Sequence, residues 1–424
     1  MRRPSKDSPK LSAESQRLVS ISQAIVQAAS RVEERTWERN LDSQLQKLLK
    51  TNHQDSIDGA LNVLFKGDLA AYDVLMDCVE AVSESSCMTE QAGAADGAET
   101  QWQTLLVAAP VLAWTRFAIA SGTIPGDVLG TLGAHLSAHL LAEGTEVALA
   151  PTLYSIDQLP RTHAETYALT HKLAQTAHKS GKNGGKGNVR PAEPGPDTSQ
   201  FLADTRYLLA AVVAPQGAPL FRWQEPQHHV NFEAVRDAAL EQWRAQAGPS
   251  IGRLLPGCGI ELLLPEAYYV ACREADKLIR PVSIRAAVHY LTHTLGVEPG
   301  DLRAVVAGFG DEASDTQVDE YRVGFTLRQQ SDVVYGIVWP LYGQEDEEGT
   351  PMEGPAPGER PLAPLDEIVS HLNEVGITHV KRIGERYVAE YCDDCGAPLF
   401  ADPSGELVHA EMPEDTPAGN EHFH

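Results

Sequence analysis

The chain contains 424 residues, of which 42% are hydrophobic and 22% are charged, and its formal net charge at pH 7 is −25. This length exceeds what one ordinary hydrophobic core supports, so we expect two or three domains in a soluble globular protein. The strong negative charge repels phosphate backbones and anionic lipids, which disfavours binding to nucleic acid or to membranes except through a local basic patch.

The cysteine content and the first residues predict a cytoplasmic protein. Six cysteines in a chain of this length are too few for a disulfide scaffold, and most of them resemble small apolar residues of a reduced protein. The basic stretch MRRPSKDSPK is followed by an amphipathic pattern rather than by an unbroken apolar run. It therefore does not have the pattern of a secretory signal.

Residues 1–178 show the periodicity of an all-helical domain. Leu18, Ile21 and Ile25 recur at steps of three and four residues, and comparable steps continue as far as Val79. Such spacing places apolar side chains on one face of each helix. We therefore expect a first domain built from helices alone.

Two segments within this first domain need separate interpretation. The most apolar window, 105–122, contains Pro110 and Arg116, so a buried helix is favoured over a membrane span. The segment 84–99 is rich in small and polar residues and is expected to form an exposed loop.

A linker separates this region from a second type of pattern. Residues 179–200 are rich in Gly, Lys and Pro and bury too little apolar surface to repay ordering, which predicts a flexible linker. Residues 201–342 then favour an α+β domain. Its expected strands are 206–215, 218–223, 260–265, 301–309, 319–329 and 333–341, the last two forming a hairpin. Its expected helices are 232–247, 266–279 and 283–295.

The remaining chain predicts three further segments. Residues 343–364 form an acidic linker rich in Pro and Gly, and residues 365–391 are expected to add a helix and two strands that complete the α+β unit. A strand hairpin, a helix and a strand occur on both sides of the middle helices, which suggests a duplicated unit. Residues 392–424 form a tail that contains cysteine and histidine.

Four stretches stand out along the chain: LSAESQRLVSISQAIVQAASRVEER near the start, YSIDQLPRTHAETYAL at 154–169, FLADTRYLLAAVVAP at 201–215 and CDDCGAPLF at 392–400. Together they resemble a family of proteobacterial proteins of unknown function, DUF2863. The resemblance covers nearly the full length. It implies a fold shared with those relatives and supplies no activity, substrate or catalytic residue.

The tail contains the most specific chemical motif. Cys392 and Cys395 are separated by two residues, a spacing that lets both sulfur atoms face one ion, and Gly396 tolerates the backbone bend that follows. A short hairpin is predicted next, and pairing Ala401 with Glu406 across its turn would bring a histidine back towards the cysteines.

The histidine brought back by this hairpin is His409, which the pairing places opposite Pro398. A fourth ligand is expected from His422, with His424 as the alternative. Two thiolates and two neutral imidazoles would balance the charge of Zn²⁺ and complete a tetrahedral structural site in a knuckle-like hairpin. Zinc would then fold a segment too small to have a core of its own.

Two alternatives compete with a zinc site. A redox-active cysteine pair normally lies at a helix amino terminus, whereas here Pro398 and a predicted strand follow, and Asp393 and Asp394 disfavour a thiolate unless a cation is bound. The other alternative is a solvated tail in which the two cysteines are close only by chance.

Two pairs of histidines are weaker metal candidates. His135 and His139, and likewise His289 and His293, are four residues apart on predicted helices, so both rings of each pair lie on one face. Neither pair has the glutamate that follows the first histidine in metalloprotease helices. Half-buried packing is therefore the favoured interpretation of both pairs.

Three other motifs give little support to a ligand or catalytic site. The run AGFGDEA at 307–313 has glycine spacing like that of a dinucleotide fingerprint, but acidic residues and another strand follow it. The run GKNGGKG at 181–187 resembles a phosphate loop in composition only. Cys258 lies between two glycines, which favours a tight turn over a nucleophile.

Three functions remain compatible with this chain. The first is a non-enzymatic adaptor or regulatory protein with a structural zinc site and an unknown protein partner. The second is a metal-dependent hydrolase or transferase that uses the helical histidine pairs. The third, an RNA-associated factor, is disfavoured by the net charge of −25.

Overall fold

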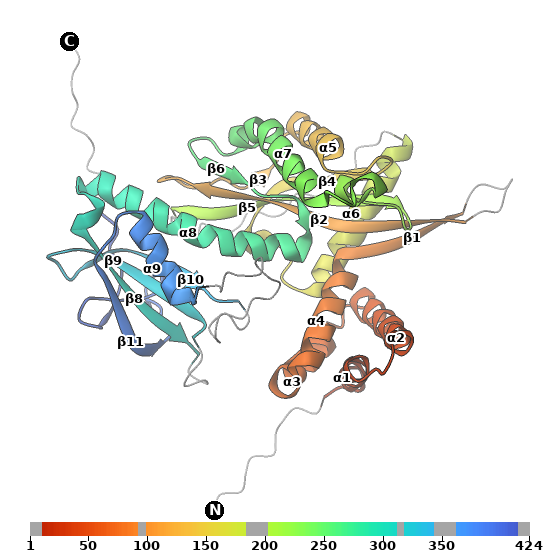
Figure 1. Ribbon diagram of the computed structural model, residues 1–424, viewed down its shortest axis with the longest axis horizontal. Helices are drawn as coiled ribbons and strands as arrows, with labels where there is room; N and C mark the ends of the chain where they lie inside the picture. The colour runs from red at the N-terminus through yellow and green to blue at the C-terminus, as the bar shows by residue number, and fades with distance from the viewer. Residues whose placement is uncertain (1–10, 92–98, 184–201, 312–317, 343–361, 414–424) are drawn as a thin grey trace, which may run out of the picture.

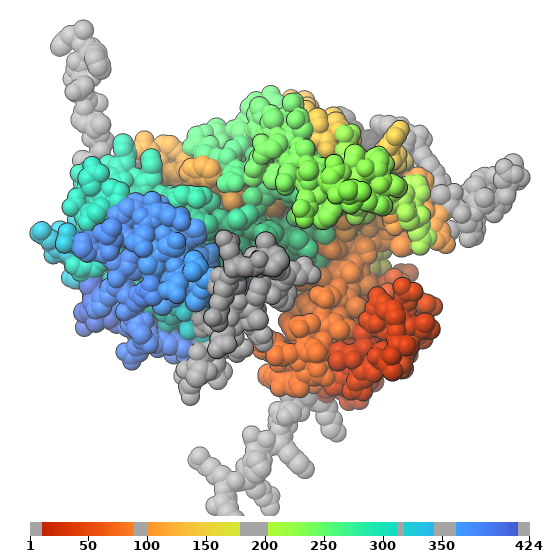
Figure 2. All heavy atoms as spheres, in the orientation of Figure 1, coloured from red at the N-terminus to blue at the C-terminus, as the bar shows by residue number. Residues whose placement is uncertain are grey.

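The computed structural model describes residues 11–91, 99–183, 202–311, 318–342 and 362–413, and its arrangement is shown in Figure 1. Its described residues form a mixed α/β protein with an amino-terminal helical bundle, two larger sheets and a small two-stranded sheet near the carboxyl end. In the space-filling view the bundle is a distinct lobe (Figure 2). The carboxyl-terminal module, which comprises the described residues from 302 to 413, lies at the other end of the molecule. No helix among the described residues is long and apolar enough to cross a membrane.

The helices predicted from the periodicity of the first part of the chain are confirmed for residues 13–84. Side-chain oxygens of Ser12, Ser30 and Asp68 accept backbone N–H groups at three of the helix starts, which satisfies donors that have no partner inside the helix. Leucine, isoleucine and valine side chains from all four helices form one core. The helices are α1 (Ala13–Val26), α2 (Arg31–Lys50), α3 (Gln54–Gly67) and α4 (Leu69–Glu84).

The prediction that residues 1–178 are entirely helical is wrong after α4. The expected loop at 84–99 contains a strand at Ser85–Gln91, and the apolar window begins within a long strand at Glu99–Trp114 rather than in a helix. The elements that follow α4 are β1 (Ser85–Gln91), β2 (Glu99–Trp114), β3 (Gly122–Thr123), α5 (Gly126–His139), β4 (Glu146–Ser155) and α6 (His163–Asn183).

The apolar window was misassigned because β2 is covered on both faces. Val107, Ala109 and Val111 pack on one side with helices α5 and α7 (Phe232–Leu254). Leu106 and Ala108 pack on the other side with α6 and α8 (Tyr268–Leu295). A strand buried on both faces has a continuous apolar run instead of alternation, and periodicity cannot distinguish such a run from a buried helix.

The first sheet also removes the expected domain boundary at residues 179–200. Strand β5 (Ala203–Pro215) pairs antiparallel with β2 on one edge and β4 on the other, so chain from both sides of the boundary forms one sheet. Helix α6 continues to Asn183, past the expected start of the linker, and residues 184–201 lie outside the described residues. The sheet order is β1-β2-β5-β4-β3, with β6 (Gly259–Leu262) and β7 (Glu266–Ala267) also pairing with β2.

Helix α8 joins the two sheets. The sequence predicts two helices here, whereas the structure has one helix that continues through Pro281. Its first half packs on the first sheet through Ala271 and Ala275, and its second half packs on the second sheet through Ala287 and Leu291. Figure 1 shows α8 extending from one sheet to the other. One continuous helix therefore connects the two larger sheets.

The second sheet has the order β10-β9-β8-β11. The hairpin predicted for residues 319–329 and 333–341 is confirmed, because β9 and β10 pair antiparallel. The two strands expected near the end are one strand, β11, which runs parallel to β8. The expected strand at 218–223 is instead an isolated bridge followed by a short 3₁₀ helix, and the expected duplication is not confirmed. The elements are β8 (Leu302–Gly310), β9 (Glu320–Leu327), β10 (Val333–Pro340), α9 (Pro364–Glu374) and β11 (Val380–Val388).

The two faces of this second sheet have different covers. Helices α8 and α9 cover one face around Val323, Phe325 and Trp339. The other face carries Val305, Ala307 and Phe309, which form a small cluster with the carboxyl-terminal hairpin. The acidic linker expected at 343–364 lies almost wholly outside the described residues, and α9 begins at its last residue, Pro364. The cysteine motif therefore belongs to a segment that is packed on a sheet.

Candidate metal centre

The two cysteines occupy a tight backbone turn. The N–H of Cys392 donates to the carbonyl of Ala397 at 2.7 Å, and the N–H of Gly396 donates to the carbonyl of Cys392 at 2.8 Å. Gly396 has a φ of +72°, in the left-handed region that side chains disfavour, as the bend after the second cysteine requires. A bridge between Tyr391 and Pro398 closes the base of this turn.

The predicted hairpin forms with a register that differs by one residue. Strand β12 (Phe400–Ala401) pairs with β13 (Leu407–Val408), and Ala401 faces Leu407 rather than Glu406. The turn holds one extra residue because Asp402 Oδ1 accepts the N–H groups of residues 404, 405 and 406. Partial burial alone would raise the pKa of Asp402, but the Ser404 hydroxyl, which donates to the same oxygen at 2.7 Å, and these three N–H groups favour the ionised carboxylate and lower it.

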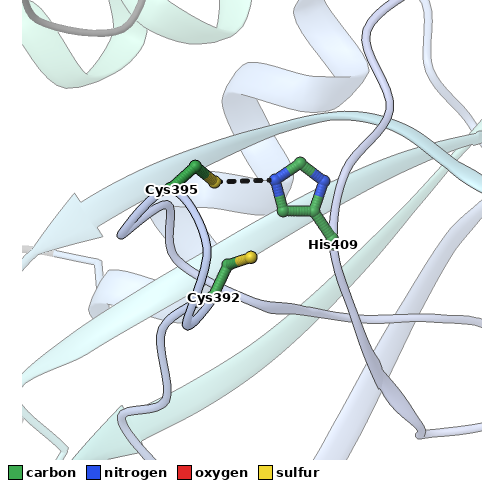
Figure 3. Close-up of side chains that lie close together, drawn as sticks. All are labelled: Cys392, Cys395 and His409. Carbon is green, nitrogen blue, oxygen red and sulfur yellow. Dashed lines mark hydrogen bonds between the residues drawn. The ribbon is translucent and has the colours of Figure 1, made fainter.

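This hairpin brings His409 to the cysteines. The Sγ of Cys395 lies 3.2 Å from Nε2 of His409, and the candidate ligand atoms of Cys392, Cys395 and His409 all lie within 4.8 Å of one another. Figure 3 shows both sulfur atoms and the imidazole ring directed towards one point. Each ligand lies about 2.0–2.3 Å from a zinc ion, so two ligands of one ion lie closer together than about 4.6 Å. The 3.2 Å pair is within this limit, and the group as a whole lies close to it.

The backbone of the turn favours the thiolate form of Cys392. Hydrogen bonds from the N–H groups of Cys395 and Asp394 lower the pKa of the Cys392 thiol, and this effect exceeds the opposing influence of the Asp394 carboxylate. The Asp394 carboxylate does disfavour the Cys392 thiolate, as expected, but the hydrogen bonds of the turn outweigh it. No helix follows the pair, since the chain continues into β12, so the activation comes from amide groups of the turn itself.

A buried arginine beneath the turn was missed in the sequence. The Nη1 of Arg322 in β9 donates to the carbonyls of Glu390 and Leu399 at 2.7 Å each, and these two residues flank the cysteine turn. The Arg322 side chain is fully buried, and its Nε donates to the Glu320 carboxylate at 2.6 Å. Its guanidinium carbon also lies 4.3 Å from the ring centroid of Phe309. Arg322 thus fixes both ends of the turn that presents the cysteines.

Two glycines allow the hairpin to approach the sheet closely. A Cβ atom added to Gly336 would meet the Phe400 ring at 2.3 Å, and one added to Gly324 would meet the Ala401 carbonyl oxygen at 3.1 Å. Phe400 and Ala401 are both buried in this contact. The only feature of the sequence that indicates this contact is the presence of two glycines inside strands, because a glycine in a strand often marks the close approach of another segment.

The remaining candidate residues lie elsewhere. His422 and His424 lie outside the described residues. His135 and His139 stack on α5 with ring centroids 6.0 Å apart, and His289 and His293 lie on α8 with centroids 6.5 Å apart. Within the described ranges, the cysteine–histidine group is the only place where at least three metal-ligating side chains converge.

The other sequence motifs do not form catalytic groups in the described structure. Burial raises the pKa of the Cys258 thiol, so its reactive thiolate form is disfavoured. The glycine-rich run at 307–313 begins inside β8, and the next described element is β9 rather than a helix. A phosphate site of the dinucleotide type needs the amino terminus of a helix at this point.

A protein-family model matches nearly the whole chain. The model of the family described as "Protein of unknown function (DUF2863)" matches residues 3–423. The chain belongs to this family. No curated protein and no solved structure matches the chain. Membership extends over both sheets and the cysteine hairpin, so the metal-site candidate lies within the span of the family match.

Proposed function

We propose that Cys392, Cys395 and His409 bind one zinc ion, with His422 or His424 as the fourth ligand. The observation that carries this proposal is the convergence of two sulfurs and one imidazole nitrogen within 4.8 Å. Thiolate and imidazole together form the ligand set of structural zinc sites, whereas calcium and magnesium require oxygen ligands.

The ion would act mainly on folding, as the zinc of a knuckle-like hairpin. The paired strands β12 and β13 contain two residues each, and only the two of β12, Phe400 and Ala401, are buried. Ligand bonds from the turn and from His409 would close the open end of this hairpin, which the Arg322 hydrogen bonds anchor from below. Binding free energy at such a site becomes folding free energy.

We further propose a cytoplasmic adaptor or regulatory protein without an enzymatic activity of its own. The metal ligands lie at the surface of a peripheral hairpin, and Cys395 is exposed, whereas catalytic metals normally occupy a cavity. The metal-enzyme alternative would need a third ligand beside one of the helical histidine pairs, and the described residues provide none. A zinc-stabilised hairpin on the second sheet would then present a surface to a protein partner.

Metal analysis of the full-length protein tests the zinc proposal. We expect about one zinc per chain after purification without chelator. The double variant Cys392→Ser, Cys395→Ser is expected to lose at least about nine-tenths of it, because a hydroxyl does not replace a thiolate ligand. Elemental analysis by plasma mass spectrometry gives the ratio.

Two matched variants complete this experiment. Cys87→Ser removes a cysteine that is also exposed but lies in β1, and it is expected to retain the metal. His289→Ala, His293→Ala is expected to retain it as well. Full metal content in the Cys392/Cys395 double variant would reject the site, and loss of metal in the His289/His293 variant would instead support the metal-enzyme alternative.

Affinity purification from native extract tests the adaptor role. We expect a stoichiometric protein partner with the wild-type chain and with Cys87→Ser, and loss of this partner with the Cys392/Cys395 double variant. Retention of the partner by the metal-free variant would show that the hairpin is not the docking element. Turnover of a small-molecule substrate by the wild-type protein would contradict the absence of an enzymatic activity.

A further inference from the structure

A cavity between the two modules has a lining unlike the rest of this acidic protein. Its volume is about 560 Å³, within the usual range for small-molecule sites. The described lining residues include two arginines and two histidines but no carboxylate. The lining residues that could contact a ligand through charged or aromatic groups include Trp114, Phe117, Arg285, His289, Tyr290 and His293. In a chain with a net charge of −25, this is a local basic surface.

One stripe of α8 supplies the basic wall. Arg285, His289 and His293 are four residues apart and therefore share a face of the helix. The opposite face, with Ile284, Val288 and Leu291, is buried against the second sheet. All three basic side chains are exposed, and none of the ion pairs between described residues involves Arg285. The helical histidines thus line a cavity.

The first sheet supplies an aromatic wall on a fixed loop. Trp114 ends β2, and Phe117, three residues later, is 58% exposed. The guanidinium carbon of Arg116 lies 5.1 Å from the Phe117 ring centroid. The N–H of Thr115 donates to the Leu202 carbonyl at 2.9 Å and its hydroxyl to the Gly257 carbonyl at 3.1 Å. This wall is therefore largely preformed.

Trp114 is held in place by a close contact with the backbone. A Cβ atom on Gly259 would meet the indole ring at 2.3 Å, so only glycine allows the ring to lie there. The third aromatic residue, Tyr290, comes from α8 and donates its hydroxyl to the Pro413 carbonyl at 2.7 Å. Aromatic rings on both walls can stack on a planar ring, and the guanidinium groups can bind phosphate or carboxylate oxygens through paired N–H groups.

We propose that this cavity binds a small anion composed of an aromatic ring and a phosphate, of the size of a nucleoside monophosphate. The phosphate would lie against Arg285, His289 and His293, and the ring against Trp114 and Phe117. The binding requires no metal and shares no residue with the cysteine site. It therefore goes beyond the proposed zinc and adaptor roles and stands or falls separately from them.

The volume and the lining favour this class over simpler anions. A bare phosphate would contact the basic stripe alone and would leave the exposed Phe117 ring without a contact to the ligand. A neutral nucleoside would contact the aromatic wall alone. Only a ligand with both groups engages the two modules at once, because the basic stripe lies on α8 and the aromatic loop follows β2. Its binding would also bridge the first sheet and the second half of α8.

Calorimetric titration of the full-length protein with AMP, adenosine and inorganic phosphate tests the proposal. We expect AMP to bind with one site per chain, at least about tenfold more tightly than adenosine or phosphate. Arg285→Ala is expected to weaken AMP binding about 10- to 100-fold, because a charge-assisted hydrogen-bonding group is lost, and Arg285→Lys less so because the charge remains.

Controls separate this effect from a change in folding. Lys277→Ala removes an exposed positive charge from the same helix outside the cavity and is expected to bind AMP like wild type. Phe117→Ala is expected to weaken AMP without weakening phosphate. Absence of AMP binding, equal affinity of Arg285→Ala and wild type, or phosphate binding as tightly as AMP would each overturn the proposal.

Discussion

Replacing Arg322 with methionine is expected to lower the free energy of unfolding of the carboxyl-terminal module by about 3–5 kcal/mol, the usual effect of removing one partner of a buried ion pair. The change leaves Glu320 without its partner and removes the two 2.7 Å hydrogen bonds to the carbonyls of Glu390 and Leu399. These carbonyls flank the cysteine turn, so bound metal should also dissociate faster. Urea denaturation and the rate of zinc transfer to a chromogenic chelator measure the two effects.

The matched control is another arginine of the same sheet. Arg382 in β11 pairs with Asp366 at 2.9 Å, but both side chains are about half exposed, at 46% and 53%. Arg382→Met is therefore expected to change stability by no more than about 1 kcal/mol and to leave zinc release unchanged. If the Arg322 and Arg382 variants unfold and release zinc alike, Arg322 does not hold the turn.

The variant Glu84→Gln is expected to stabilise the protein at pH 8 by about 1–3 kcal/mol, because an unfavourable buried charge is removed. Glu84 ends α4, and its carboxylate accepts the N–H of Tyr269 from α8 at 3.1 Å. Burial raises the pKa of Glu84 from 4.5 to about 7, with a further contribution from the charge of Glu80. Glutamine has the same shape and keeps an oxygen that can accept this hydrogen bond.

The direction of the pH dependence follows from proton counting. Between pH 4.5 and about 7 the folded protein keeps a proton on Glu84 that the unfolded chain loses, so wild-type stability falls as the pH rises through this range and then levels off. The stability of the Glu84→Gln variant should not show this part of the decline with rising pH, and it should equal the stability of the wild type near pH 4.5. Burial also raises the pKa of Asp276 to about 6, so a smaller decline remains in the variant.

Chemical denaturation at several pH values between 4.5 and 8 checks this prediction. Glu241→Gln is the control, because this side chain is 72% exposed and pairs only with Arg244 on the same helix. That variant should have the pH profile of wild type. A Glu84→Gln protein that keeps the wild-type slope between pH 5 and 7 would contradict the assignment of the slope to this buried carboxyl group.

The metal-site candidate could be predicted from the sequence because its determinants are local. The spacing of Cys392 and Cys395, the glycine after them and the turn-forming residues of the hairpin all act within about twenty residues. The register was wrong by one residue because the three hydrogen bonds to Asp402 lengthen the turn, and composition does not specify that geometry. Arg322 is seventy residues before Cys392, and nothing near it in the chain indicates its role.

The sequence alone determined three features: the bundle of α1 to α4, the β9–β10 hairpin and the close approach of the two cysteines. Periodicity, caps and turns are properties of neighbouring residues, so they can be recognised without the tertiary structure. Only the tertiary structure decided that residues 105–114 form a strand, because burial on both faces removes the alternation that would reveal it. It also decided that α8 is shared by two sheets and that His289 and His293 face a cavity with Trp114. These features depend on contacts between distant segments, which no local pattern contains.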